Sequence, residues 1–253
     1  MGQQLGQYAE DVRDLVADNL GMLIPEARLT RYINQARKQV AKYARCITVL
    51  VPGQCPAGAS ALPGELVPGG GTPGAAADSL FQTIVGQEMY AYGYANQYVQ
   101  EWNSGVAGVL DVIQVAVSWG GAMRPAMQWM PWDDYQAYLR ANQYLTQAWP
   151  AVWSTLGDGS MAAVYLFPTP SVASEMEWLV VCNPKDIYTN DDYDVLPEPF
   201  DSAVKYYAAH LAYLRSQRPG QASLMLNTFY DHVGVDRASA DGGKVSNYYY
   251  SYP

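Results

Sequence analysis

The chain has 253 residues, a formal net charge of −9 at pH 7 and a hydrophobic share of 49%. That share is large enough to form a core, so the composition excludes disorder of the whole chain. Only 15 lysines and arginines are spread along the sequence, which excludes a clamp that grips nucleic acid through clustered positive charge. The 21 tyrosines outnumber the four phenylalanines. This excess favours protein-binding surfaces, because tyrosine joins an apolar ring to a polar hydroxyl.

The three cysteines, Cys46, Cys55 and Cys182, match neither a disulfide framework nor a zinc half-site. We therefore expect reduced thiols. The first residues contain no charged-then-apolar leader, so we expect no signal peptide. The most apolar stretch contains Asp111 and Gln114, and these polar residues exclude a membrane span there. The sequence predicts a soluble protein.

Two helical patterns open the chain. Apolar residues recur at three- and four-residue steps from Leu5 to Leu20, which predicts a helix that Gly21 ends. A second pattern starts at Pro25 and continues to Tyr43, and the two predict an antiparallel helical hairpin. The basic residues of the second helix fall opposite its apolar side, and we expect them to face solvent: Arg28, Arg31, Arg37 and Lys38.

A short β run at residues 46–52 leads into residues 53–79, which are crowded with Gly, Pro and Ala and have no periodicity. Such a segment cannot build a core of its own, so we expect a flexible loop that reaches toward a neighbour or a central opening.

The middle third changes to strand-like patterns rich in Val, Ile, Tyr and Trp. Between them, residues 131–145 predict an inserted helix that Pro131 opens. The whole predicts a central antiparallel β-sandwich or small barrel. The expected strands lie at residues 80–85, 88–94, 108–119, 122–129, 161–170 and 176–183.

The C-terminal region returns to helices. Pro197 and Pro199 precede an apolar pattern that ends near Leu214, and a second pattern follows the break at Arg218 to Gly220. Periodicity is lost after Arg237. The remaining arm ends in four rings that are costly to leave in water, so we expect them to bind a partner: Tyr248, Tyr249, Tyr250 and Tyr252.

These patterns predict an α+β protein with segregated layers. Residues 1–46 and 196–236 are expected to form a helical domain in which the N- and C-terminal hairpins pack together. Residues 47–195 are expected to form the β module, and residues 237–253 an extended aromatic arm.

Motifs for catalysis are weak. His210 and His232 lie beside apolar helical stripes, where a structural role is more common than pairing with Cys182 as a nucleophile. The acidic run from Asp191 to Asp194 lacks the pattern of a calcium loop, and we expect a solvated turn. We predict no enzyme activity, no catalytic residue, no metal and no cofactor.

In order along the chain, several segments carry a resemblance. They are IPEARLTRYINQARKQVAKYAR, FQTIVGQEMYAY, VLDVIQVAVSWGGAMRPAMQWMPWDDYQAYLRA, PAVWSTLGDGSMAAVYLFPTPSVASEMEWLVVCNPKDI and DDYDVLPEPFDSAVKYYAAHLAYLRSQ. From about Leu5 to Val233 the chain resembles the head-to-tail adaptor proteins of short-tailed bacteriophages, of the connector, gatekeeper or tail-tubular kind. Residues 53–79 depart from that pattern.

The resemblance implies a structural virion protein at the head–tail interface, present in the host cytoplasm during assembly. It implies a homo-oligomeric ring, commonly dodecameric, that joins the portal protein to the tail nozzle protein and lines the channel for DNA packaging and ejection. DNA would pass without specific binding, and no membrane would be involved. We assign portal binding to Tyr248, Tyr249, Tyr250 and Tyr252, and subunit or tail contacts to Tyr207, Tyr213, Trp129 and Trp132.

An alternative is a β-sandwich tail component that binds or cleaves glycans. Such a protein needs two carboxylates, for which Asp133, Asp134, Glu175 and Glu177 are available, and aromatic platforms, for which Trp129, Trp132, Trp149 and Trp153 are available. A third possibility is that the chain is an ordinary soluble α+β domain that binds an unrelated ligand.

Overall fold

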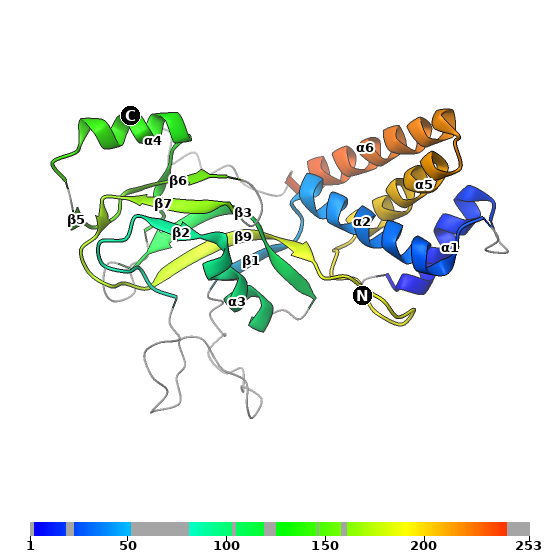
Figure 1. Cartoon of the computed structure of the whole chain (residues 1–253), viewed down its shortest axis with the longest axis horizontal. Coiled ribbons are helices and arrows are strands. Elements are labelled where there is room, and N and C mark those ends of the chain that lie inside the picture. Colours follow the sequence, from blue (N-terminus) through cyan, green and yellow to red (C-terminus); the bar gives the residue numbers. More distant parts are fainter. Residues whose placement is uncertain are drawn as a thin grey trace, which may run out of the picture. The chain divides into compact units, whose positions relative to one another are not determined.

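The computed structural model describes residues 3–18, 23–51, 81–102, 105–118, 125–145, 147–157 and 161–241. The chain divides into two units (Figure 1). The helical unit combines Met1–Ile47 with Pro184–Pro253, and the β unit is Thr48–Asn183. The predicted mixed α+β class is confirmed. Residues 184–195, which we expected in the β module, belong to the helical unit.

The helical unit contains α1 (Leu5–Val16), α2 (Glu26–Ala44), a short 3₁₀ helix (Phe200–Ala203), α5 (Val204–Arg215) and α6 (Pro219–Asp241). α5 is the central element and packs against α1, α2 and α6 (Figure 1). Its alanines make this close packing possible, because small side chains let neighbouring helices approach. The buried residues of α1 and α2 follow the predicted helical period: Leu5, Tyr8, Val12, Val16, Leu29, Ile33, Ala36 and Val40.

Three described helices end next to a residue with left-handed backbone. α2 ends at Ala44, and Arg45 has a φ of 52°. α1 ends at Val16 because Ala17 has a φ of 57°, so the predicted end at Gly21 was wrong. α5 ends at Arg215, and Gln217 has a φ of 56°. The amides of Gln217 and Arg218 donate to Leu214 O (3.2 Å) and Tyr213 O (3.0 Å). This is a Schellman motif with glutamine where glycine is usual.

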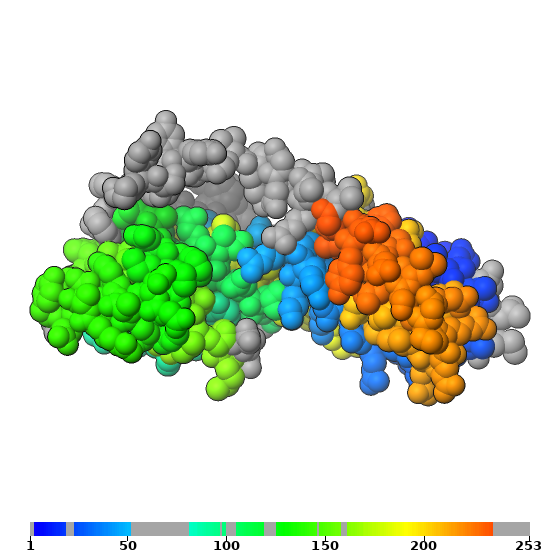
Figure 2. Space-filling view, turned by 90° about the horizontal axis from the view of Figure 1, so that it is seen from above, coloured from blue at the N-terminus to red at the C-terminus, as the bar shows by residue number. Residues whose placement is uncertain are grey.

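α6 is longer than the sequence suggested. Pro219 occupies its first position, where the missing amide is not needed. The helix continues to Asp241, so residues 237–241 do not begin an extended arm, as we had predicted. Figure 2 shows α6, orange to red, at the surface of the helical unit, where Leu224 and Tyr230 are exposed. Among the described helices, none has both the length and the apolar character needed to cross a bilayer.

The β unit contains small sheets of both pairing types. One has the order β1 (Thr48–Val51), β9 (Met176–Pro184), β3 (Val106–Val117), and another β2 (Met89–Ala91), β7 (Ala163–Phe167), β6 (Val152–Leu156), β4 (Gln128–Trp129). β5 (Gln147–Ala148) pairs with β8 (Thr169–Pro170). β1–β9, β2–β7 and β6–β7 are antiparallel, whereas β4–β6 and β5–β8 are parallel. The expected antiparallel pairing is confirmed for the longer strands, and parallel pairing is found at the two-residue strands β4, β5 and β8.

Two helices belong to the β unit. α4 (Trp132–Ala141) lies within the predicted segment 131–145 and beside the four-stranded sheet (Figure 1). Its Tyr135 packs on Val152 and Phe167 of that sheet. α3 (Tyr92–Trp102) replaces the second half of the strand expected at 88–94 and packs against β3. Of the segment 80–85, also expected as a strand, the structure describes residues 81–85, in which Gln82 forms an isolated bridge with Glu175. The predicted loop 53–79 lies outside the described residues.

An aromatic cluster fills the space between α3 and β9. The ring of Phe81, which is 1% exposed, lies 5.1 Å from each of the rings of Tyr94, Tyr98 and Trp178. Aromatic pairs at such distances stabilise a core beyond the area they bury. Phe81 therefore links the helix to the sheet.

We predict that Phe81→Ala lowers the free energy of unfolding of the β unit by about 3–5 kcal/mol, because it opens a cavity among three rings. Chemical denaturation followed by tryptophan fluorescence measures the change. Val85→Ala is the matched control, since Val85 is 53% exposed and its truncation should cost less than about 0.5 kcal/mol. Equal losses for both variants would contradict this account of the core.

Candidate functional site

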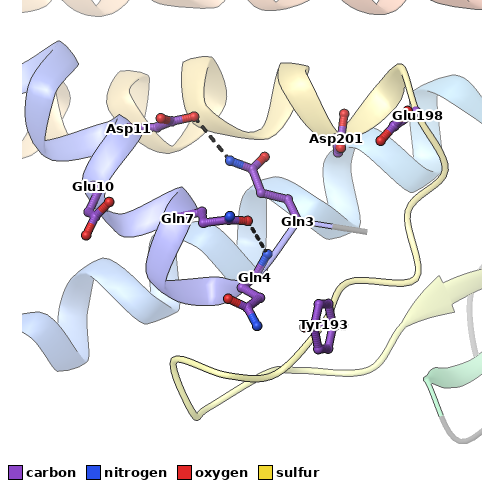
Figure 3. Close-up of a pocket in the computed structure, with 8 residues that line it drawn as sticks. All are labelled: Gln3, Gln4, Gln7, Glu10, Asp11, Tyr193, Glu198 and Asp201. Atoms are coloured by element: carbon purple, nitrogen blue, oxygen red, sulfur yellow. Dashed lines mark hydrogen bonds between the residues drawn. The ribbon is translucent and has the colours of Figure 1, made fainter. Parts of the chain in front are cut away.

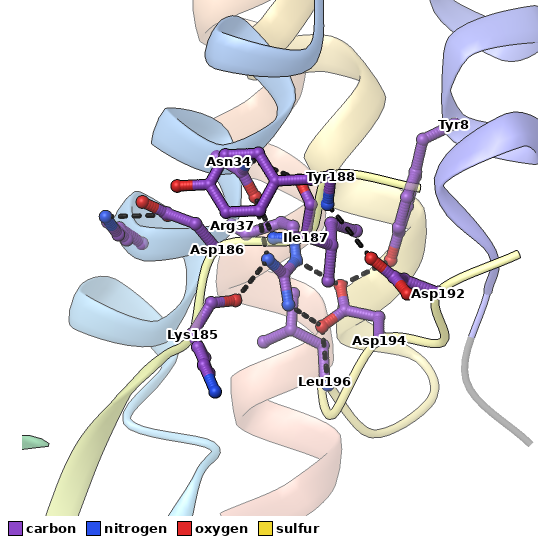
Figure 4. A network of polar contacts seen from close by, with 11 residues as sticks. Tyr8, Asn34, Arg37, Lys185, Asp186, Ile187, Tyr188, Asp192, Asp194 and Leu196 are labelled. Carbon is purple, nitrogen blue, oxygen red and sulfur yellow. Dashed lines mark hydrogen bonds and ion pairs between the residues drawn. The ribbon is translucent and has the colours of Figure 1, made fainter. Parts of the chain in front are cut away.

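A buried ion pair links α2 to the chain before α5 within the helical unit (Figure 4). Arg37 of α2 is 1% exposed. Its Nε and Nη2 donate to the two carboxylate oxygens of Asp194 at 2.9 and 2.6 Å. Its Nη1 donates to Asn34 Oδ1 (2.9 Å) and to the carbonyl of Lys185 (2.8 Å). The expectations that Arg37 faces solvent and that Asp194 belongs to a solvated turn were wrong.

The remaining polar groups of this network also have partners. The Tyr8 hydroxyl of α1 donates to Asp194 Oδ2 at 2.9 Å, and the amide of Leu196 donates to Oδ1 at 3.1 Å. Burial, together with the charge of Asp194, raises the pKa of Tyr8 above its usual value, so its hydroxyl stays a neutral donor. The Asn34 amide group binds the backbone of Ile187 through both of its atoms (2.8 and 3.0 Å). The network thus ties α1 and α2 to the chain from Lys185 to Leu196.

Backbone hydrogen bonds extend this tie to the start of α1. The amides of Leu5 and Gly6 donate to the carbonyls of Asp192 (3.2 Å) and Asn190 (3.1 Å). The carboxylate of Asp192 closes the adjacent turn. Hydrogen bonds from the side chain and amide of Thr189 and from the amide of Tyr188 lower the pKa of Asp192 to about 2.

An open groove of about 560 Å³ lies beside this segment (Figure 3). We call it the acidic groove, because four carboxylates line it: Glu10, Asp11, Glu198 and Asp201. Its other lining residues are three glutamines of the α1 start and Tyr193. Lys205 offsets part of the charge, since its Nζ lies 3.4 Å from Asp11 Oδ2.

A second hollow, of about 390 Å³, has the opposite charge. We call it the basic cleft, because Arg28, Arg215 and Arg218 line it together with Tyr32 and Tyr213. All three arginines are exposed, and none forms an ion pair with a residue that the structure describes.

Two features hold the basic cleft in shape. The Schellman motif at the end of α5 brings Arg218 back beside Arg215. The buried carboxylate of Asp18 accepts hydrogen bonds from the amides of Leu23 (3.1 Å) and Ile24 (2.9 Å), which fixes the approach to α2. The cleft is therefore built from buried contacts, and its charged groups remain open to solvent.

The predicted interface residues of α5 contact other parts of the helical unit. The ring of Tyr207 lies 5.1 Å from that of Phe229 and is half-buried. Tyr213 is buried, and its hydroxyl donates to the carbonyl of Leu15 at 2.8 Å. Of the two, only Tyr213 lines the basic cleft. The predicted portal-binding residues, Tyr248, Tyr249, Tyr250 and Tyr252, lie outside the described residues.

The predicted tryptophans lie in the β unit and differ in exposure. Trp129 on β4 is 52% exposed. Trp132 stacks on Tyr135, with ring centroids 5.6 Å apart. Trp153 is buried, and its Nε1 donates to Met127 O at 3.2 Å, so it belongs to the core and is not available to stack on a sugar.

The residues weighed for catalysis have packing roles. His210 Nδ1 lies 2.8 Å from the carbonyl of Ala222, and the ring of His232 stacks on Tyr206 at 4.7 Å. Cys182 is buried in the β unit, whereas both histidines lie in the helical unit. Within the described part of the chain, no group of three or more histidines, cysteines and carboxylates has metal-binding geometry.

Hollows lined by charged side chains and tyrosine rings are typical of a protein that works by binding other proteins. The model of the SU10 adaptor protein family matches residues 3–245, so the chain belongs to that family. This match confirms the adaptor identity that the resemblance implied, and a phage adaptor is a component of the virion. No curated protein matches the chain.

We predict that Asp194→Asn lowers the free energy of unfolding of the helical unit by about 3–5 kcal/mol, because it leaves the Arg37 guanidinium buried without a counter-charge. The change is measured by urea denaturation followed by circular dichroism. The control is Lys38→Met, which removes a partly exposed ion pair in which Lys38 Nζ lies 2.7 Å from Asp186 Oδ1. It should cost less than about 1 kcal/mol. Similar costs for both variants would show that the buried network is dispensable.

We predict slow thiol chemistry at Cys46 and Cys182. Burial raises the pKa of each thiol to about 12, so at pH 8 only about one thiol in ten thousand is ionised. Alkylation by iodoacetamide, followed by mass spectrometry of the two peptides, should be about a hundredfold slower or more in the native protein than in urea. Equal rates in both states would contradict the prediction.

Proposed function

We propose that the protein is a head-to-tail adaptor of a short-tailed bacteriophage. In this role its copies form a ring that joins the portal protein to the tail nozzle protein and lines the DNA channel. The observation that carries the proposal is the family match over residues 3–245. It covers both units, so the proposal concerns the whole described fold.

The charge of the chain supports a channel through which DNA passes without being held. The net charge is −9, and a surface of this sign repels phosphates instead of replacing their counterions. In the proposed ring the helical unit forms the subunit layer and the β unit faces the tail. The role is structural, with no catalytic residue and no cofactor.

Four aromatic residues were predicted to serve subunit or tail contacts: Tyr207, Tyr213, Trp129 and Trp132. Tyr213 is buried within the helical unit, and Tyr207 and Trp132 are partly buried, so their proposed role is to support the contact surface. Trp129 suits such a contact best, since its ring is half exposed and apolar.

Electron microscopy of the purified chain mixed with the portal protein of its own virus tests the function. We expect a second ring stacked on the portal ring, and the same mixture should then bind the nozzle protein. The portal alone, mixed with a control protein of similar charge, sets the background. Portal rings that stay bare at saturating concentrations of this chain would contradict the proposal.

The C-terminal arm provides a narrower test. Deletion of residues 242–253, which leaves α6 complete, should weaken portal binding about a hundredfold or more, because four aromatic anchors are lost. A full-length variant with phenylalanine at Tyr248, Tyr249, Tyr250 and Tyr252 keeps the rings and should bind far better than the deletion. Portal binding by the deleted chain at native affinity would refute this assignment.

A further inference from the structure

The acidic groove and the basic cleft lie at opposite ends of the same pair of helices. α1 and α5 lie side by side and run in the same direction. Lys205 near the start of α5 contacts Asp11 in the middle of α1, and Tyr213 near the end of α5 contacts Leu15 near the end of α1. Each helix has 12 residues, which spans about 18 Å at about 1.5 Å per residue. The acidic groove includes the start of α1, and the basic cleft includes the end of α5.

The helix dipoles explain part of this arrangement. Negative charge is favoured at helix starts and positive charge at helix ends. That effect does not require either set of charges to line a hollow. It also leaves Arg28 unexplained, because Arg28 lies in the first turn of α2, where a positive charge is disfavoured. The placement of Arg28 beside Arg215 and Arg218 is better explained by binding of a carboxylate-bearing partner.

We propose that the acidic groove of one copy of this chain binds the basic cleft of the next copy. The inference rests on the proposed function, because it names the surfaces through which the ring would close. Two different surfaces on one rigid unit give a head-to-tail contact, and repetition of that contact closes a ring when the rotation between copies is suitable. Arginine and carboxylate groups form strong, directional pairs, often through two hydrogen bonds.

A second copy fits these surfaces better than DNA does. DNA phosphates would meet three arginines in the basic cleft, but the protein around it carries a net charge of −9, and the acidic groove would repel them. The groove and the cleft are complementary in charge and are present in equal numbers in any assembly of this chain. The exposed carboxylates Glu10 and Glu198 are the strongest candidates to meet the arginines.

Two neutralised variants of the full chain test the inference. One carries Glu10→Gln and Glu198→Gln in the acidic groove, and the other carries Arg28→Gln, Arg215→Gln and Arg218→Gln in the basic cleft. By sedimentation velocity at low ionic strength, the native chain should self-associate, and added salt should weaken this association. Each variant alone should associate at least about tenfold more weakly than the native chain. An equimolar mixture should form a dimer and nothing larger, because each variant keeps one working surface.

A control variant with Lys42→Gln and Asp231→Asn changes exposed charges of the same unit that line neither hollow. It should associate like the native chain. Native-like association of both neutralised variants would overturn the inference, as would a mixture that forms no dimer. If high salt restores self-association of the cleft variant, that result would also overturn the inference, because it indicates an apolar interface elsewhere.

The same variants added to portal rings separate this inference from the proposed function. Rings that form equally well from the native and neutralised chains would overturn the charged contact and leave the adaptor role standing. Native chains that associate through the two surfaces but leave the portal bare would support the charged contact and contradict the adaptor role. A native chain that associates neither alone nor on the portal would contradict both.

Discussion

The helical unit depends on the buried pair of Arg37 and Asp194. Burying two charges is costly, and the cost is offset only where the geometry is good and the remaining donors and acceptors have partners. Here the guanidinium makes four hydrogen bonds, two of them to Asp194. Asp194 in turn accepts from Tyr8 and from the amide of Leu196. A network this complete fixes one arrangement of α1, α2 and the chain that precedes α5.

This buried network determines a surface. The segment that it holds carries Tyr193 and leads to Glu198, and both line the acidic groove together with the first turns of α1 (Figures 3 and 4). A shift of the segment would therefore change the position of the groove relative to the basic cleft at the far ends of α1 and α5. The proposed ring would need such rigidity, because small errors in the angle between copies accumulate around a ring.

Much of the helical architecture could be predicted from apolar periodicity, since Leu5, Val12, Leu29 and Ile33 each face the core. Arg37 was missed because its charge suggested solvent, although it lies four residues after Ile33 and three before Val40, on the same stripe. The first residues of α3, 92–94, were read as part of a strand because tyrosine has high β propensity. Tyr94 and Tyr98, four residues apart, carried the helical signal. The two hollows combine residues from distant parts of the sequence, so only the fold brings them together.

The family match and the resemblance agree on an adaptor, and the charges and packing of the helical unit give that role a physical basis. The central claim is that this chain works through contacts with copies of itself and with the proteins of the capsid vertex. The most direct measurement is electron microscopy, with DNA quantification, of virus particles assembled in cells where this chain is not produced. The account predicts heads that have portals but lack tails and have lost their DNA. Particles that keep their genomes and carry complete tails would contradict it.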